Sequence, residues 1–177
     1  RLAHRLRAGG LAQGDCAVLL MDNRLELLAC VTACAKLGVV VAMLNTSQRG
    51  QVLAHSINLV KPRIALVGEE LLEAFTDVQD NLNLPADACY FFADRPTWRD
   101  PGQAPTDWQH PAAELTAQPA SKPQLTRPVQ AEDPCFFIYT SGTTGLPTAV
   151  VFNHGRFLKG YGIFGFGAVR LSRDDRL

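Results

Sequence analysis

The chain has 177 residues, of which 47% are hydrophobic, and its 17 basic side chains balance its 17 acidic ones. This length and apolar content suffice for one domain with a buried core, or for a sizeable part of a larger domain. A net charge of zero argues against a protein that binds nucleic acid by neutralising phosphates along a groove.

The five cysteines lie in apolar runs and form no Cys-x-x-Cys pair; they are Cys16, Cys30, Cys34, Cys89 and Cys135. No His or further Cys completes a metal-binding set with them, so we expect buried free thiols in a reducing compartment and no metal site. The sequence shows no signal peptide and no apolar run of the ~18 residues that a membrane span needs. The expected location is therefore the cytoplasm, or the cytoplasmic face of a membrane through peripheral association.

The first ninety residues alternate between helical patterns and short apolar runs. The pattern predicts a first helix that ends at Gly9-Gly10 and three further helices over residues 23–37, 50–59 and 69–82. In the helix over residues 23–37, Asn23 is the expected N-cap and Gly38 ends the helix. It predicts strands at residues 16–21, 39–44, 64–67 and 88–92. This alternation is typical of an α/β fold with a mainly parallel, doubly wound sheet flanked by helices.

The pattern breaks between residues 95 and 130, where seven prolines interrupt a polar stretch without sustained periodicity. Unstructured loops of this length are uncommon inside compact domains. We interpret the stretch as a long surface excursion with one helical turn near residues 112–115. A linker between domains is the rival interpretation, but the apolar run that follows needs a sheet to join, and the earlier strands supply one.

That apolar run, from Phe136 to Tyr139, predicts a buried strand, and the residues after it are rich in hydroxyls and glycines. Residues 140–145 contain four hydroxyl side chains and two glycines, which expose backbone N–H groups and allow close approach to a ligand. Consecutive N–H groups of this kind form concave anion sites that hold phosphates. The alternative is an ordinary Ser/Thr/Gly turn.

A return strand is predicted at residues 149–152, and Asn153 or His154 then begins a segment in which aromatic residues alternate with glycines. Glycines weaken a helix but permit close packing, or an apolar ligand lying against the backbone. For any single Phe of this segment, packing in an aromatic core is the alternative. For His154, a capping or packing role is as plausible as a chemical one.

The order of residues 139–147, Tyr-Thr-Ser-Gly-Thr-Thr-Gly-Leu-Pro, resembles the phosphate-binding motif of the adenylate-forming (AMP-binding) superfamily, which includes acyl-CoA synthetases and luciferases. It differs from a Walker loop, because no Gly-Lys-Ser/Thr follows, and from a nucleophile elbow, because Tyr139 stands two residues before Ser141. The sequence departs from the family at Thr148, where relatives have Lys. This loss of a cation bears on ATP affinity.

Weaker similarities lie in the same order along the N-terminal part of the chain, at residues 14–26, 36–39, 44–46 and 53–55. They resemble fatty-acid-transport proteins and very-long-chain acyl-CoA synthetases more than peptide-synthetase domains. The resemblance implies a partial N-terminal adenylation domain over residues 1–177, with the excursion at 95–130 as an insertion in it. It also implies that the adenine- and ribose-binding motifs, the Mg²⁺-associated Glu and the C-terminal domain with its catalytic Lys lie downstream, so no catalytic or metal-binding residue is expected here.

The resemblance further implies that the parent protein is a ligase for long-chain or very-long-chain fatty acids, which uses MgATP to form an acyl-adenylate and then transfers the acyl group to coenzyme A. The residues expected to bind the ATP phosphates are Thr140, Ser141, Gly142, Thr143, Thr144, Gly145 and Thr148. The acyl channel is expected near Phe157, Tyr161 and Phe164.

The chain begins with Arg1 in an apparent helix and ends in a charged segment. We therefore expect it to be a fragment that is inactive on its own. The alternative from a different class is a non-catalytic phosphate-binding or interaction module, or the truncated product of a decayed gene.

Overall fold

The structure is a computed structural model that describes residues 1–94, 105–141, 145–170 and 172. These residues form a six-stranded sheet in the order β4-β3-β1-β2-β5-β6. All neighbouring strands are parallel except β5 and β6, which pair in antiparallel fashion. The strands are β1 (Cys16–Leu20), β2 (Val40–Met43), β3 (Ile64–Gly68), β4 (Cys89–Phe92), β5 (Pro134–Ser141) and β6 (Pro147–Asn153).

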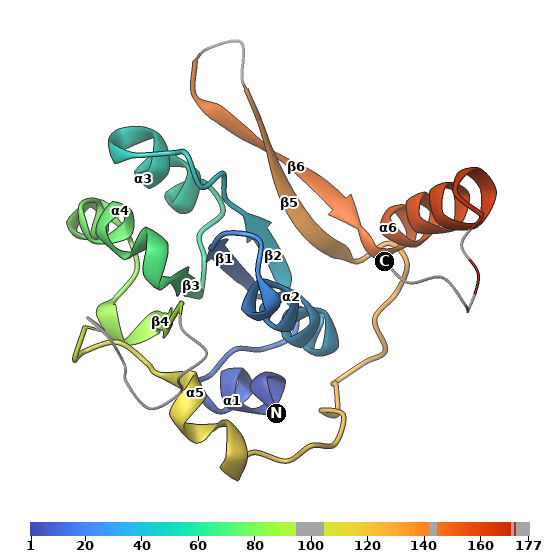
Figure 1. Cartoon of the computed structure of the whole chain (residues 1–177), viewed down its shortest axis with the longest axis horizontal. Coiled ribbons are helices and arrows are strands. Elements are labelled where there is room, and N and C mark those ends of the chain that lie inside the picture. The colour runs from blue at the N-terminus through green and yellow to red at the C-terminus, as the bar shows by residue number, and fades with distance from the viewer. Residues whose placement is uncertain (95–104, 142–144, 171, 173–177) are drawn as a thin grey trace.

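Helices cover both faces of the parallel part of this sheet (Figure 1). The helices α1 (Leu2–Ala8) and α2 (Leu25–Leu37) pack against one face, with Leu6, Cys34 and Leu37 in the core that they share with the strands. The helices α3 (Gly50–Leu59) and α4 (Leu72–Thr76) pack against the other face through Leu53, Ile57 and Phe75. The predicted α/β fold with a mainly parallel, doubly wound sheet is therefore confirmed.

Two predictions about the helices were wrong. Asn23 does not cap α2: Arg24 is the N-cap, without a side-chain cap bond, because its guanidinium group is held by the carbonyl groups at the end of β4. The single helix predicted at residues 69–82 is divided into a 3₁₀ turn at Glu69–Leu71, α4, and a second 3₁₀ turn at Gln79–Asn81. The helix α4 ends at Thr76, where Thr76, Asp77 and Val78 are three successive residues of low helix propensity.

The described part of the proline-rich excursion, residues 105–130, is attached along the body of the protein. The predicted helical turn is confirmed as α5 (Pro111–Glu114), which a 3₁₀ turn at Leu115–Ala117 continues. Trp108 is buried against Phe75 at 5.2 Å between ring centroids, and Gln109 exchanges backbone hydrogen bonds with β4. The excursion therefore covers the β4 edge of the sheet.

Side chains of α1 fix the rest of this segment. Arg5 is almost fully buried, and it donates to Gln109 Oε1 at 2.6 Å and forms an ion pair with Glu114 at 2.6 Å. His4 and Arg7 bond the carbonyl groups of Ser121 and Gln124. Because backbone carbonyls accept these bonds, a segment with no hydrophobic periodicity can still be tightly attached.

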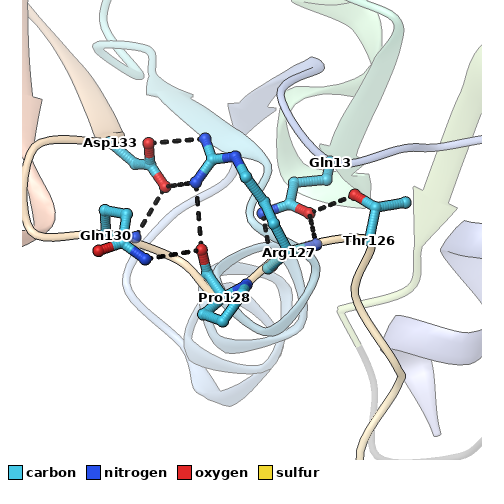
Figure 2. Close-up of polar contacts among 6 residues, drawn as sticks. All are labelled: Gln13, Thr126, Arg127, Pro128, Gln130 and Asp133. Carbon is cyan, nitrogen blue, oxygen red and sulfur yellow. Dashed lines mark hydrogen bonds and ion pairs between the residues drawn. The ribbon is translucent and has the colours of Figure 1, made fainter.

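The segment ends in a polar clamp in front of β5, which Figure 2 shows. Arg127 donates to both carboxylate oxygens of Asp133, at 2.7 and 2.8 Å, and the Gln130 N–H donates to Asp133 Oδ2 at 2.8 Å. Gln13 bonds Thr126 and the Arg127 backbone from the loop that precedes β1. The clamp thus connects the end of the excursion to the body of the protein where β5 begins.

The strand β5 is less buried than predicted. Cys135 is its one buried residue in the structure, and the Ile138 side chain is 41% exposed. The reason is topological, because β5 and β6 lie at the end of the sheet, and on the face that carries Phe136 and Ile138 the helix α6 (His154–Tyr161) contacts β5 through Phe157 at Phe136. Figure 1 shows the two strands extending away from β1–β4.

The chain continues from β6 into α6 (His154–Tyr161) and then into a π-helical stretch, Gly162–Ala168. Asn153 caps α6, because its side-chain oxygen accepts a hydrogen bond from the Arg156 N–H at 2.7 Å. Of the predicted openings of this segment, Asn153 thus provides the cap and His154 the first helical residue. None of the helices in the described ranges is long and apolar enough to cross a bilayer.

Candidate phosphate-binding site

The hydroxyl- and glycine-rich segment lies at the end of the β5–β6 hairpin. Thr140 and Ser141 are the last two residues of β5, Gly145 precedes β6, and Thr148 is the second residue of β6. All four are exposed. Gly142, Thr143 and Thr144, which the sequence also assigns to the site, lie outside the described residues.

The hairpin holds the side chains of Thr140 and Thr148 together. The two residues are directly paired across the strands, and their Oγ1 atoms are 3.2 Å apart, which is hydrogen-bonding distance. Alternation along β5 and β6 places both side chains on the face that also carries Ile138 and Val150. Thr148, where the sequence resemblance leads us to expect Lys, is therefore paired with another residue of the candidate site.

Gly145 has the backbone conformation that such a loop requires. Its φ is +86°, in the left-handed region that favours glycine, and a Cβ atom at this position would meet no atom within 4 Å. The space beside its backbone is thus open to a ligand. Exposed hydroxyls and an accessible backbone fit the phosphates of a nucleotide, which accept hydrogen bonds from O–H and N–H donors.

A groove of about 590 Å³ lies beside the base of the hairpin, and its lining includes His55, Lys61, Phe137, Pro147 and Thr148. Lys61 follows the end of α3 in a left-handed conformation, with φ of 47°. Sequence reasoning missed that this cation shares a groove with Thr148, because the two residues are far apart along the chain and meet where α3 contacts β6. The nearest cations in sequence are Arg156 and Lys159, and the Arg156 guanidinium lies 4.5 Å from the centroid of the Phe152 ring.

The usual ligand crevice of an open α/β sheet, outside the carboxyl ends of the strands where the strand order reverses, is occupied by the protein's own side chains. The reversal lies between β1 and β3. Glu70 after β3 accepts a hydrogen bond from the Asp22 N–H after β1 at 2.8 Å. Arg24 lies beside this pair and donates to the carbonyl groups of Phe92 and Ala93 at the end of β4. This network leaves the hairpin as the exposed candidate site.

The aromatic residues predicted near the acyl channel lie on α6 and the π-helical stretch. Phe157, Tyr161 and Phe164 are 48%, 54% and 69% exposed in the described part of the chain. Phe157 contacts Phe136 of β5 at 5.5 Å between ring centroids. Ile138 and Val150 of the hairpin are exposed apolar residues as well.

The cysteine thiols are not activated in this fold. The five cysteines are free thiols, and burial raises the pKa of each of them, to about 12 for Cys16, Cys34 and Cys89. Within the described ranges, no three His, Cys, Asp or Glu side chains are grouped so that they could hold a metal ion. His154 donates its backbone N–H to the Asp133 carbonyl, a structural contact at the start of α6.

Comparison with known proteins agrees with the resemblance in the sequence. The medium/long-chain-fatty-acid–CoA ligase FadD6 of Mycobacterium tuberculosis is 31% identical over 100% of this chain and 27% of its own length. Long-chain fatty acid transport protein 6 of Mus musculus is 32% identical over 94% of this chain and 26% of its own length. This chain therefore spans about a quarter of the length of these relatives.

The fold also matches solved structures. The anthranilate CoA ligase AuaEII, solved in complex with anthranoyl-AMP, aligns with a TM-score of 0.79 and 20% identity over 94% of this chain and 30% of its own. The model of the AMP-binding enzyme family matches residues 1–177, the whole of the chain. The chain belongs to the AMP-binding enzyme family.

Proposed function

We propose that this chain supplies the phosphate-binding hairpin of an ATP-dependent fatty acyl-CoA ligase. The observation that carries the proposal is the position of residues 140–148: the hydroxyl-rich segment connects two strands that extend away from the sheet, with Thr140, Ser141, Gly145 and Thr148 exposed. Within the family to which the chain belongs, a segment of this composition is suited to hold the β- and γ-phosphates of ATP.

In the proposed reaction, a carboxylate oxygen of the fatty acid attacks the α-phosphorus of ATP, the acyl-adenylate forms, and pyrophosphate leaves. The thiol of coenzyme A then displaces AMP from the acyl carbon. The first step requires that the departing phosphates be held in line and that their charge be stabilised. The hydroxyls of Ser141, Thr143 and Thr144 and the N–H groups around Gly145 would do this in the complete enzyme. A magnesium ion bound with ATP would neutralise further phosphate charge.

The names of the relatives support the substrate class, because one is a medium/long-chain-fatty-acid–CoA ligase and another a long-chain fatty acid transport protein. We propose a long-chain or very-long-chain fatty acid as the acyl donor, with the chain of the acid lying along the surface that carries Phe157, Tyr161 and Phe164. Peripheral association with the cytoplasmic face of a membrane would suit such a substrate.

The proposal is tested by ATP–pyrophosphate exchange with the full-length protein, in the presence of fatty acids of graded length. Exchange that depends on a fatty acid supports the ligase. If MgATP or pyrophosphate binds and no acid supports exchange, the second candidate, a non-catalytic phosphate-binding module, is the correct one. The second candidate is favoured by Thr148, a neutral residue at the position where the family resemblance leads us to expect a lysine.

A further inference from the structure

The β5–β6 hairpin needs support where it leaves the sheet. β2 pairs with β5 at Phe136, Phe137 and Ile138, and beyond Ile138 the described residues of β5 pair with β6. From Tyr139 onward the hairpin is thus a two-stranded ribbon, and isolated two-stranded ribbons are marginally stable in water. Some other contact must fix its direction.

The last turns of α3 provide this contact to both strands. The Tyr139 hydroxyl of β5 donates to the Ser56 carbonyl at 2.6 Å, and His55 Nε2 lies 3.2 Å from the Pro147 carbonyl oxygen of β6. The Ser56 carbonyl lies near the C-terminal end of α3, in its last turn. Pro147 is paired with Ser141, so the second contact lies directly across from a residue of the site.

The chemistry of the four groups determines the direction of both bonds. A carbonyl oxygen only accepts, so Nε2 of His55 carries the proton of its bond to Pro147. Burial raises the pKa of the Tyr139 phenol above its usual value, which keeps the hydroxyl protonated and able to donate. The Tyr139 contact lies one pair before the Thr140–Thr148 pair along the ribbon, and the Pro147 contact lies one pair beyond it, toward the loop.

We propose that His55 is a positioning residue for the phosphate-binding loop: with Tyr139, it fixes the hairpin against α3 so that the loop is held in the place where ATP binds. This rests on the proposed function of the hairpin. His55 acts through the Pro147 backbone and not on the nucleotide. Binding sites lose affinity when their supporting contacts leave them about 1 Å too loose, so the loss of this bond should weaken MgATP binding without affecting steps that follow the release of pyrophosphate.

The test uses five variants of the full-length protein: four single variants, and the double variant that combines His55→Leu with Tyr139→Phe. His55→Leu removes the N–H donor and leaves an apolar side chain of similar size in its place. His55→Gln keeps an N–H donor at this position. Tyr139→Phe removes only the hydroxyl. The matched control is Asn58→Ala in the same turn of α3, because Asn58 bonds the backbone of Asn81 and Asn83 and not the hairpin. The measurements are KM for MgATP in pyrophosphate exchange, the rate of acyl transfer from preformed acyl-adenylate, and hydrogen exchange of the peptide 147–153.

We expect His55→Leu and Tyr139→Phe each to raise KM for MgATP about three- to tenfold, the range of one neutral hydrogen bond. The double variant should lose less than the product of the two effects, since both contacts support one ribbon. His55→Gln should recover most of the loss. Hydrogen exchange in 147–153 should become faster in His55→Leu, while that of β1 and the rate of acyl transfer stay unchanged.

The proposal is overturned if Asn58→Ala raises KM as much as His55→Leu does, because the effect would then be general destabilisation. Unchanged hydrogen exchange of 147–153 in His55→Leu would overturn it as well. Hydrogen exchange can be measured without a ligand. If residues 147–153 of His55→Leu exchange faster but the wild-type protein does not bind MgATP, His55 does hold the hairpin against α3, and the function proposed for the hairpin is refuted.

Discussion

Thr148 stands where the resemblance to the adenylate-forming superfamily leads us to expect Lys, and the structure shows its neighbours. Its hydroxyl lies 3.2 Å from that of Thr140, and Lys61 lines the same groove. An ammonium group is a mobile point charge with three donors, whereas Thr keeps one donor and no charge. The hairpin therefore presents hydroxyls to a highly charged ligand with no cation from within the motif.

We expect Thr148→Lys in the full-length enzyme to tighten MgATP binding by about 1–2 kcal/mol, or roughly five- to thirtyfold. Salt should reduce the gain, because it screens an exposed charge. The dissociation constants of both proteins at two salt concentrations measure this effect. A matched comparison in a Lys61→Ala background shows whether Lys61 already supplies the charge. If Thr148→Lys has the same dissociation constant for MgATP as the wild type at low salt, the site does not lack a positive charge at residue 148.

The hydroxyls of the loop should act in one half-reaction and not in the other. Replacement of Thr143 and Thr144 together by Ala removes two hydrogen bonds to charged oxygens, each worth about 1.5–3 kcal/mol, and should weaken adenylation strongly. Transfer of preformed acyl-adenylate to coenzyme A should lose much less, since pyrophosphate has already left.

The control for that double variant is Thr32→Ala, which removes a hydroxyl that bonds the Leu28 carbonyl of its own helix. It should leave both half-reactions near the wild-type rates. Equal losses in both half-reactions of the Thr143 and Thr144 variant would mean that the loop is a structural turn.

At the scale of the residue, the sequence identified groups in one continuous motif and missed groups that the fold brings to it. Thr140, Ser141 and Gly145 could be chosen because nine adjacent positions carry the pattern. His55 and Lys61 could not, because their contact with the hairpin depends on how α3 crosses the sheet. Asn23 was predicted as a cap from its residue type alone. In the structure α2 begins one residue later, after Arg24, whose side chain bonds the carbonyl groups at the end of β4.

At the scale of the element, the proline-rich segment shows the limit of periodicity as a guide. The sequence predicted its turn near residues 112–115 but described the whole as a surface excursion. The structure attaches residues 105–130 through Trp108, Gln109 and the cations of α1. Backbone carbonyls accept many of these bonds, and every residue has one, so no side-chain pattern in the segment could reveal them.

The clamp between Arg127 and Asp133 gives this segment a pH dependence. The Arg127 guanidinium, and then the Gln130 N–H, lower the pKa of Asp133 from 3.8 to about 2. The folded state therefore binds fewer protons than the unfolded state between these values. The stability that the clamp contributes is complete above about pH 4, and it is lost as pH falls through 2.

Pepsin, which is active over this range, can detect the change. We expect Asp133→Asn to be cleaved near residues 124–133 faster than the wild-type protein at pH 4, because the variant lacks the clamp. At pH 2 the two proteins should be cleaved at similar rates, since protonation has then weakened the clamp in the wild type also. A ratio of rates that is the same at both pH values would show that the clamp does not hold the segment.

At the scale of the whole molecule, the sequence predicted the class of fold and the positions of the strands, but not their order. Short apolar runs separated by helices imply parallel neighbours, and any of several orders would satisfy that pattern. The order matters for the site. It places β5 and β6 at one end of the sheet, where the hairpin is exposed, and it brings the Arg24 network to the crevice between β1 and β3.

This end of the sheet and the helix that follows it leave many large apolar side chains exposed in the described residues. They are Ile138, Val150, Phe157, Leu158, Tyr161, Ile163, Phe164, Phe166 and Val169, which are 41% to 74% exposed. Exposed apolar side chains that gather into a patch favour association, and β6 has β5 as its one strand neighbour in the described sheet. We expect the 177-residue chain expressed alone to self-associate. Sedimentation of a monomer with a sharp, cooperative melting transition would contradict this expectation.

The last prediction is that the 177-residue chain alone catalyses no ATP–pyrophosphate exchange. The site that we propose would contact the phosphates alone, and within the described residues no cluster of His, Cys, Asp or Glu could hold a metal ion beside them. Adenylation also requires that adenine, ribose and the fatty acid be held in line with the α-phosphorus, and a phosphate contact alone does not orient them. The chain should therefore bind pyrophosphate weakly and leave ATP intact at every fatty acid concentration. The assay compares the chain, its Thr148→Lys variant and a blank without protein, each with fatty acids of several lengths. Exchange above the blank would show that the hairpin and its sheet are a sufficient adenylation site.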